Sequence, residues 1–306
     1  TVPGIGVVTT DALGQAQFNI SSPVTINLTG IDGRHHQVVQ GSDQPTASES
    51  VTPGVNKTIT LLTSGATIPQ AAHTTASWWT DNTNEFARSI LGNTSQLNTA
   101  SNIAVNVNIA NSCNAWYGGN SINFYAAGGG CSNTAFSTVI SHEWGHGLDD
   151  RYGGISQING LSEGWGDIVG LYLVDSPILG SGFSTAGVGI RNGTNTRQYP
   201  SGSTVHAQGE SWMGFAWKLR DRLATTLGSR PSAVALTNDI VIGTVVAYAT
   251  NQEDAVLEVF LADDNDGNLA NGTPNYLDLS WAATQHALPF PVVLPNDECS
   301  GAIALV

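Results

Sequence analysis

The pattern of apolar and polar positions changes character along the chain, and the first part has the pattern of a β domain. From Gly4 to about Leu62, short runs rich in β-branched residues, such as IGVVTT, VTINL and TITLL, alternate with turn-forming clusters such as DALG and SSP. Short runs of this kind, bounded by Gly, Pro, Asp and Ser, are typical of strands joined by tight turns. The pattern predicts a small antiparallel β domain over residues 1–66.

The pattern becomes helical in the next stretch, TIPQAAHTTASWWTDNTNEFARSILG, residues 67–92. Gly92 stands where a helix of this length would end. We therefore place a domain boundary near residue 67. Four apolar residues recur near helical spacing: Ala71, Trp78, Phe86 and Ile90.

Two strand patterns, IAVNVNIA and INFYAA, precede a helical stretch, TAFSTVISHEWGHGL. The apolar side of that helix carries Phe136, Val139, Ile140 and Trp144. The order of strands followed by a helix indicates a sheet with one helix packed beside it. We expect residues 67–290 to form an α+β domain.

The C-terminal half is mainly helical in pattern, over SEGWGDIVGLYLVD, AQGESWMGFAWKLRDRLATTL, ALTNDIVIGTVVAYAT and TPNYLDLSWAATQHAL. After Leu288, the alternation of Pro and apolar residues in PFPVVLP is typical of a linker, and AIALV resembles the start of a strand. We expect residues 291–306 to be a linker and the start of a further, truncated domain. In the second helix, one stripe is apolar: Trp212, Phe215, Ala216, Leu219 and Leu223.

Charge and composition exclude several classes of partner. Ten Lys and Arg against 24 Asp and Glu give a net charge of −14, which opposes binding to nucleic acid or to anionic lipid. No apolar run reaches the roughly 20 residues that a membrane-spanning helix needs. Only 11% of the residues are charged, and the surface is rich in neutral polar residues, which favours a secreted protein. The start at Thr1 favours a processed chain.

The stretch SHEWGHGLDDRYGGISQINGLSEGWGD, residues 141–167, carries candidate metal ligands. His142 and His146 are four residues apart, so on a helix they project from one face and can bind one ion. Glu143 lies between them. An H-E-x-x-H string arises by chance in roughly one such composition in 250, which favours a zinc site over two histidines in ordinary polar roles.

Catalytic zinc keeps three protein ligands and one open position, so a third ligand is required. Glu163 is the best candidate, because it starts the next helical pattern after a long Gly-rich turn. Asp167 shares its face four residues later and is suited to accept the ring N–H of His142. The alternative is that Glu163 is only a first-turn acid favoured by the helix dipole.

The combination HEWGHGLDD…LSEGWGD resembles the glutamate-zincin metallopeptidases of the thermolysin and fungalysin type, with H-E-x-x-H followed by E-x-x-x-D. SEGWGD is close to the fungalysin G-E-G-W-S-D block. The resemblance implies a zincin-like metallopeptidase domain that hydrolyses peptide bonds in a protein or peptide substrate. It also implies Zn²⁺ held by His142, His146 and Glu163, with Glu143 as general base toward the zinc-activated water.

Segments outside the motif extend the resemblance. CNAWYGG is similar to the edge strand that holds an extended peptide, through Asn114 and the carbonyl of Ala115. STVHAQGESW is similar to the segment whose histidine, here His206, stabilises the oxyanion. GIRNG implies that Arg191 contacts a substrate carbonyl. No Tyr lies at the family's distance before the glutamate ligand, and Tyr152 is the nearest candidate for that oxyanion donor.

Two further groups of residues suggest structural sites. Cys113 and Cys131 flank a strand-turn-strand pattern that predicts a disulfide, with Cys299 left over. ADDNDGNLANGTPNY precedes a helix that Thr273 can cap, with Pro274 at its first position. The sequence leaves two interpretations of its oxygen-rich residues open, a calcium site and an acidic loop that faces solvent: Asp263, Asp264, Asp266 and Asn268.

The sequence thus predicts a secreted zinc endopeptidase. One competing hypothesis is a non-catalytic zincin-fold module that serves as a binding or structural part of an extracellular surface protein. Another is a peptidase restricted to glycosylated protein. The intact set of ligands and general base favours catalysis over the binding module.

Overall fold

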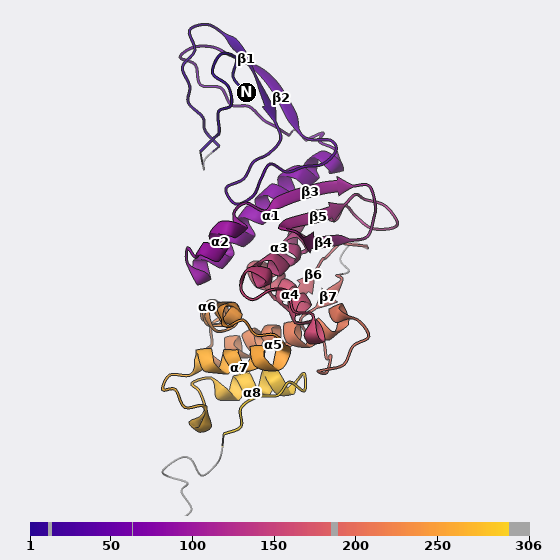
Figure 1. Cartoon of the computed structure of the whole chain (residues 1–306), viewed down its shortest axis with the longest axis vertical. Helices are drawn as coiled ribbons and strands as arrows, with labels where there is room; N and C mark the ends of the chain where they lie inside the picture. Colours follow the sequence, from indigo (N-terminus) through magenta and orange to yellow (C-terminus); the bar gives the residue numbers. More distant parts are fainter. Residues whose placement is uncertain (12–13, 63, 185–188, 294–306) are drawn as a thin grey trace, which may run out of the picture.

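The computed structural model describes residues 1–11, 14–62, 64–184 and 189–293. It has a mixed α+β architecture, as expected, with an elongated shape in which the chain runs from an N-terminal β unit through a small sheet to a helical lobe (Figure 1). The helix bounds are α1 Ile68–Leu91, α2 Ser95–Ala100, α3 Ser137–Arg151, α4 Leu161–Val174, α5 Val205–Thr226, α6 Arg230–Ile240, α7 Gln252–Asp263 and α8 Tyr276–Thr284. The strand bounds are β1 Val24–Thr29, β2 Thr46–Val51, β3 Ala104–Ile109, β4 Ala115–Gly118, β5 Ser121–Tyr125, β6 Ile178–Leu179 and β7 Arg191–Asn192.

The N-terminal unit is simpler than the sequence predicts. In its described part, only β1 and β2 form a ladder, an antiparallel pair that aligns Val24 with Val51. The other strand-like runs are irregular. The buried core of this unit consists of Val2, Ile26 and Val51. So small an apolar core offers little burial to offset the entropy of ordering further strands.

The chain before residue 67 also contributes to the larger unit. Residues 36–40 lie parallel to β3, with bridges from His36 to Ile103 and from Gln40 to Asn106. Val39 in this segment is fully buried in the main core. The boundary near residue 67 remains a prediction, and contacts with the larger unit begin well before it.

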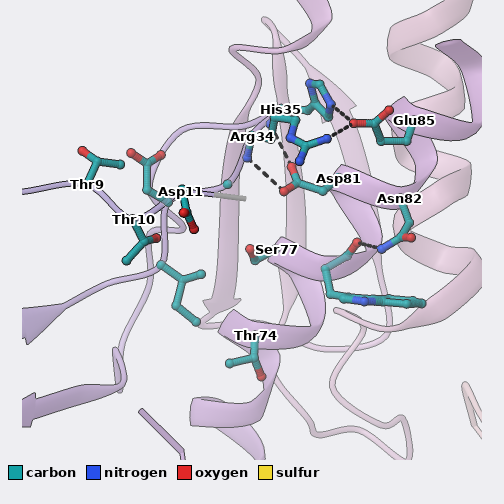
Figure 2. A pocket seen from close by; sticks show the side chains of 14 residues that line it. Thr9, Thr10, Asp11, Arg34, His35, Thr74, Ser77, Asp81, Asn82 and Glu85 are labelled. Atoms are coloured by element: carbon teal, nitrogen blue, oxygen red, sulfur yellow. Dashed lines mark hydrogen bonds and ion pairs between the residues drawn. The ribbon is translucent and has the colours of Figure 1, made fainter. Parts of the chain in front are cut away.

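A second contact between the two units involves Asp81 on α1 (Figure 2). Its carboxylate accepts the backbone N–H groups of Arg34 at 2.9 Å and of His35 at 2.8 Å. Glu85, one turn further along α1, accepts from His35 Nε2 at 2.8 Å. Carboxylates of the long helix therefore hold the segment that approaches β3.

Helix α1 begins with a capping box between Thr67 and Gln70 and ends at Gly92, as expected. Its buried face differs from the expected stripe, because Trp78 is 58% exposed. Small residues such as Ala76 and Thr80 are buried instead. They allow α3 to approach closely, so that the hydroxyls of Thr83 and Ser141 lie 3.0 Å apart.

The three-stranded sheet has the order β3-β5-β4, with β5 parallel to β3 and antiparallel to β4. β4 is therefore an edge strand. The predicted disulfide between Cys113 and Cys131 is present, with Cα atoms 5.3 Å apart, and it joins the start of β4 to the loop before α3. Cys299 lies outside the described residues.

The predicted motif helix corresponds to α3, and α4 packs closely against it. A Cβ atom on Gly145 would lie 2.8 Å from Gly166 Cα, so the two helices approach at a pair of glycines. Val139, Ile140 and Trp144 of α3 are buried, as expected. This close pair forms the centre of the larger unit.

The helical lobe confirms the apolar stripe of α5, whose five predicted residues are all buried. The predicted helix over residues 235–250 is confirmed only as far as Ile240, where α6 ends; a 3₁₀ helix spans Ile242–Ala247, and Tyr248 has φ 59°. Helix α7 was not predicted. Asn251 caps α7 by accepting the N–H of Asp254 at 2.9 Å.

Thr273 does not cap α8, which was the expected role. Helix α8 begins at Tyr276, and the Thr273 hydroxyl donates instead to Asp263 Oδ2 at 2.6 Å. The carboxylate of Asp263 thereby ties the end of α7 to the start of α8. In the described part of the chain, no helix is long and apolar enough to span a membrane.

Candidate metal centre

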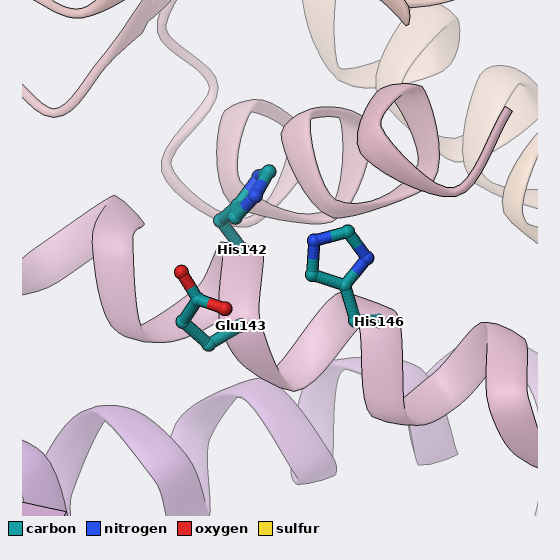
Figure 3. Close-up of side chains that lie close together, drawn as sticks. All are labelled: His142, Glu143 and His146. Atoms are coloured by element: carbon teal, nitrogen blue, oxygen red, sulfur yellow. The ribbon is translucent and has the colours of Figure 1, made fainter. Parts of the chain in front are cut away.

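Helix α3 places two imidazoles and a carboxylate together (Figure 3). His142, Glu143 and His146 are all buried, and one ligand atom from each lies within 4.8 Å of the other two. The i, i+4 spacing of the histidines brings both rings to the side of α3 that faces α4. Their ring centroids are 4.7 Å apart.

Glu163, in the first turn of α4, completes the group. Its Oε2 lies 3.5 Å from His142 Nε2 and its Oε1 lies 3.8 Å from His146 Nε2. Two ligand atoms of a tetrahedral zinc ion lie about 3.3–3.6 Å apart, given metal–ligand bonds of about 2.0–2.2 Å. Oε2 is buried without a hydrogen-bond partner in the described part of the chain. The donor set thus fits a zinc ion.

The other ring nitrogen of His142 is held from α4. Asp167 Oδ1 lies 2.8 Å from His142 Nδ1, and Asp167 is fully buried. Arg191, on β7, donates to both oxygens of this carboxylate, at 2.6 and 2.7 Å. An ionised carboxylate only accepts hydrogen bonds, so Nδ1 of His142 carries a proton, and Nε2, which faces Glu163, is the nitrogen whose lone pair a metal ion would use.

His146 is held differently, by the hydroxyl of Ser162 at 2.9 Å from its Nδ1. The sequence analysis did not single out Ser162, although it directly precedes Glu163. Three residues further along α3, burial raises the pKa of the Asp149 carboxyl to about 7. Both Nδ1 atoms are therefore occupied, and both Nε2 atoms are free for a metal.

Charges are strongly coupled in the centre when it holds no metal. Burial opposes protonation of His142, but the hydrogen bond to Asp167 raises its pKa to about 10. Burial, together with the charge on His142, lowers the pKa of His146 to about 3. Although burial alone would raise it, the pKa of Glu163 is lowered by His142. A metal ion would replace the proton on His142.

Glu143 faces the edge strand. Burial raises the pKa of its carboxyl to about 7, against a hydrogen bond from the backbone of Tyr117 on β4. On the same strand, the Asn114 carbonyl accepts from the Tyr125 N–H of β5, at 3.3 Å. Successive carbonyls of a strand alternate in direction, so the Ala115 carbonyl points away from β5. The side chain of Asn114 is exposed.

Three other predicted residues lie in different settings. His206, in the first turn of α5, is 58% exposed at the side chain, and its Nε2 lies 3.4 Å from Glu163 Oε2. Arg191 is 10% exposed at the side chain and is bound to Asp167. Tyr152 is buried, and its hydroxyl lies 2.6 Å from Thr94 Oγ1. The structure therefore does not present Tyr152 to a substrate.

Calcium binding by the acidic loop remains a prediction. Asp263 accepts from Thr273 and Asn275, and Asp266 accepts from the backbone of Asn268. Asp264 accepts the Gly267 N–H at 2.7 Å, and Asn268 accepts that of Ala270. Most of these oxygens thus stabilise the loop itself, whereas Asp264 Oδ1 is buried without a hydrogen-bond partner in the described structure. The described part of the chain holds one metal-binding group of His, Cys, Asp or Glu, the one on α3.

Comparison with known proteins identifies the fold. No protein-family profile matches the chain, and no curated protein sequence matches it. Among solved structures, the chain is similar to the precursor of protealysin, a metalloproteinase from Serratia proteamaculans, with a TM-score of 0.58 and 14% identity, over 82% of this chain and 87% of that chain. At 14% identity the similarity concerns the fold alone. It does not show whether the chain is closer to the fungalysin type or to the thermolysin type. The chain therefore has a zincin-like metalloproteinase fold, with a His-Glu-His group placed to bind a metal.

Proposed function

We propose that the chain is a zinc-dependent endopeptidase. The observation that carries the proposal is the approach of two imidazole Nε2 atoms to the buried carboxylate of Glu163, His142 at 3.5 Å from Oε2 and His146 at 3.8 Å from Oε1, with Oε2 unpartnered in the described structure. These distances are close to those between ligand atoms of a tetrahedral zinc site. His142, His146 and Glu163 would hold the ion. When bound, zinc supplies an activated water molecule and polarises the scissile carbonyl.

Glu143 has the properties of the general base. Its pKa of about 7 lies close to neutral pH, where a base accepts and returns a proton most efficiently. It takes a proton from the attacking water and delivers it to the leaving amine. Its position against β4 brings it beside the strand that we propose holds the substrate.

The substrate would bind as an extended peptide along the free edge of β4. The Ala115 carbonyl and the Asn114 side chain would set its register, as in strand addition to a sheet edge. His206, at the rim of the centre, would donate to the oxyanion. Arg191 would orient Asp167 with two of its nitrogens, and the predicted contact to a substrate carbonyl would use the rest of the guanidinium.

Two features support an extracellular protein substrate. The disulfide between Cys113 and Cys131 is typical of proteins that fold in an oxidising compartment. The net charge of −14 opposes binding to nucleic acid. We propose a secreted enzyme that acts on protein.

The test is cleavage of quenched fluorescent casein by the wild type and by the Glu143→Ala and Glu163→Ala variants, with zinc content measured in each. We expect about one zinc per chain in the wild type and in Glu143→Ala, with cleavage reduced by about 10²–10⁴-fold in the latter. Glu163→Ala should lose both zinc and cleavage. Glu258→Ala, on α7, is the control and should behave as the wild type.

Each outcome separates the hypotheses. If the wild type binds zinc and cleaves neither casein nor a broad peptide library, the non-catalytic module is correct. If the wild type cleaves casein only when it is glycosylated, the restricted peptidase is correct. If Glu143→Ala cleaves at the wild-type rate, Glu143 is not the base.

A further inference from the structure

The far end of strand β4 is attached to the helix that carries the histidines. The Tyr117 hydroxyl, on β4, donates to Asp150 Oδ2 at 2.7 Å. Asp150 lies one helical turn after His146 on α3. The same hydroxyl accepts from Arg151 Nη1 at 3.4 Å. Both hydrogen-bonding functions of this hydroxyl are therefore used on the last turn of α3, beside which β4 lies (Figure 1).

The ring of Tyr117 also packs against the backbone of α3. Gly147, which directly follows His146, leaves room for it, because a Cβ there would lie 3.0 Å from Tyr117 Cε2. Arg151 Nη1 donates to the Gly147 carbonyl at 2.5 Å, and its Nη2 donates to the side chain of Asn120, in the turn between β4 and β5. Two points of the β4–β5 hairpin, Tyr117 and Asn120, thus contact the end of α3.

These contacts lie close to the part of β4 that we propose binds the substrate. Ala115, whose carbonyl would pair with the peptide, is two residues before Tyr117, which is about 7 Å along a strand. Side chains two residues apart on a strand share one face, so Ala115 lies on the α3 side of β4. At the start of the strand, the disulfide between Cys113 and Cys131 fixes the other end.

The distance between β4 and α3 decides where a bound peptide lies relative to the metal ligands. As an edge strand, β4 has β5 as its one partner in the sheet, so the sheet alone does not determine how far β4 lies from α3. Reacting groups have to meet within about 3–3.5 Å, and a misplacement of about 1 Å can cost about 10²-fold in rate. The contacts between the hairpin and α3 therefore bear directly on catalysis.

We propose that Tyr117 is a positioning residue, whose hydrogen bond to Asp150 holds the substrate-binding strand at a fixed distance from the metal centre. The inference rests on the proposed endopeptidase function, with β4 as its substrate strand. Tyr117 acts through the strand and does not contact the reacting atoms. Peptides long enough to pair along β4 depend on this bond, whereas metal binding, whose ligands lie on α3 and α4, does not.

Two competing roles make different predictions. If the bond between Tyr117 and Asp150 only stabilises the fold, its loss lowers the free energy of unfolding and leaves kcat and KM of the folded enzyme unchanged. If the Tyr117 hydroxyl acts on the reacting atoms, its loss lowers kcat equally for short and for long peptides. A strand-positioning role predicts a loss that grows with the length of the peptide.

The experiment compares the wild type with Tyr117→Phe, Asp150→Ala and the double variant. Phe keeps the ring on Gly147 and removes only the hydroxyl. We measure kcat and KM on two peptides built around a bond that the wild type cleaves in casein: a capped dipeptide that spans only that bond, and a decapeptide that can pair along β4. Zinc content, thermal unfolding, and amide hydrogen exchange of the substrate-free protein over residues 115–118 are measured in parallel.

For Tyr117→Phe we expect kcat/KM on the decapeptide to fall by about 10-fold, mainly through KM, as the loss of one hydrogen bond to a charged group implies. Cleavage of the dipeptide should change by less than about 2-fold, and zinc content should equal that of the wild type. Exchange over residues 115–118 should become faster. Asp150→Ala should behave in the same way, and it reports on the bond even if Tyr117→Phe folds poorly.

Two controls sharpen the test. Tyr125→Phe, on β5, also removes a phenolic hydroxyl, but from a side chain whose hydroxyl forms no hydrogen bond within the described chain; its ring instead packs against Trp116. It should match the wild type in every measurement. The double variant should lose no more than the worse single variant, because Tyr117→Phe and Asp150→Ala break the same bond.

Several results would overturn the inference. Equal losses on both peptides would place Tyr117 at the reaction itself, and lower stability with unchanged kcat and KM would make it a fold anchor. Unchanged exchange over residues 115–118 would show that the hydroxyl does not hold β4. A wild type that binds zinc but cleaves no casein would refute the proposed function, and hydrogen exchange would still decide whether the bond holds the strand.

Discussion

The two histidines of the candidate metal centre are oriented by contacts at Nδ1, the ring nitrogen that faces away from Glu163. Asp167 and Ser162, both on α4, occupy the Nδ1 atoms of His142 and His146. The H-E-x-x-H and E-x-x-x-D spacings indicate the proposed ligands and Asp167, because helical periodicity puts each set on one face of its helix. Ser162 adjoins a ligand but belongs to no motif, so only the packed structure shows its partners.

A residue far from the motif gives a test of stability. His286, after α8, is fully buried; its Nδ1 lies 2.7 Å from the Arg197 carbonyl, and its Nε2 has no partner in the described structure. Burial lowers its pKa to about 4 from 6.5. The unfolded chain therefore binds a proton below pH 6.5 that the folded chain binds only below about pH 4.

We expect the contribution of His286 to the free energy of unfolding to be complete above pH 6.5. As the pH falls to about 4, roughly 3 kcal/mol should be lost, at about 1.4 kcal/mol per pH unit. Urea unfolding of the wild type and of His286→Gln at pH 7, 5.5 and 4 measures it. As the pH falls, the free energy of unfolding of the wild type should decrease by that amount relative to that of His286→Gln. A gap that stays constant would contradict the assignment.

At the scale of elements, the contact between α3 and α4 decides whether the ligands meet. A Cβ on Gly166 would lie 2.7 Å from His142 Nδ1 and 2.9 Å from the His142 carbonyl oxygen. Position 166 therefore requires glycine because a side chain there would collide with the neighbouring helix, and not because of its backbone conformation. Because glycine at this position lets the two helices pack more closely than any other residue would, Glu163 lies opposite the two histidines.

Gly166→Ala should accordingly weaken zinc binding by at least about 10-fold without removing a ligand, and should destabilise the protein by about 1–3 kcal/mol. Helix propensity alone predicts the opposite sign, a gain of up to about 1 kcal/mol. Chelator competition and urea unfolding measure the two effects. Gly243→Ala is the control, because the nearest atom to its new Cβ is 4.0 Å away. A stabilised variant with unchanged zinc affinity would show that the interhelical contact can relax.

The elements themselves were predicted unevenly. Helices α1, α3, α4 and α5 follow from apolar periodicity and end signals such as Gly92. The break after Ile240 and the separate α7 were missed, because an unbroken run of helix-compatible residues spans the kink at Tyr248. A cap at Asn251 was the available signal for α7.

At the scale of the whole molecule, the N-terminal unit is attached to the larger unit through contacts of residues 34–42. Residues 36–40 lie along β3, and Asp81 accepts the two N–H groups of Arg34 and His35. Each such bond contributes about 1 kcal/mol, and more is lost when a buried donor is left without an acceptor. The attachment is remote in sequence from the metal ligands.

We expect Asp81→Ala to increase amide hydrogen exchange over residues 34–40 while zinc content stays at the wild-type value. Hydrogen exchange followed by mass spectrometry measures the first, and metal analysis the second. Asp239→Ala, an exposed position on α6, is the control for loss of a charge. Unchanged exchange in Asp81→Ala would show that the strand-like pairing with β3 holds the segment without the carboxylate.

The sequence by itself determined the chemistry that depends on local spacing. The histidine pair, Glu143 between them, and the Glu163–Asp167 spacing each lie within one helix, whose geometry is known in advance. Tertiary structure alone decided what crosses between elements: the convergence of α3 with α4, the hydrogen bond between Ser162 and His146, the burial of Tyr152 and the use of Asp263 to join α7 to α8. Such contacts depend on shape complementarity between distant segments, which the order of residues does not display.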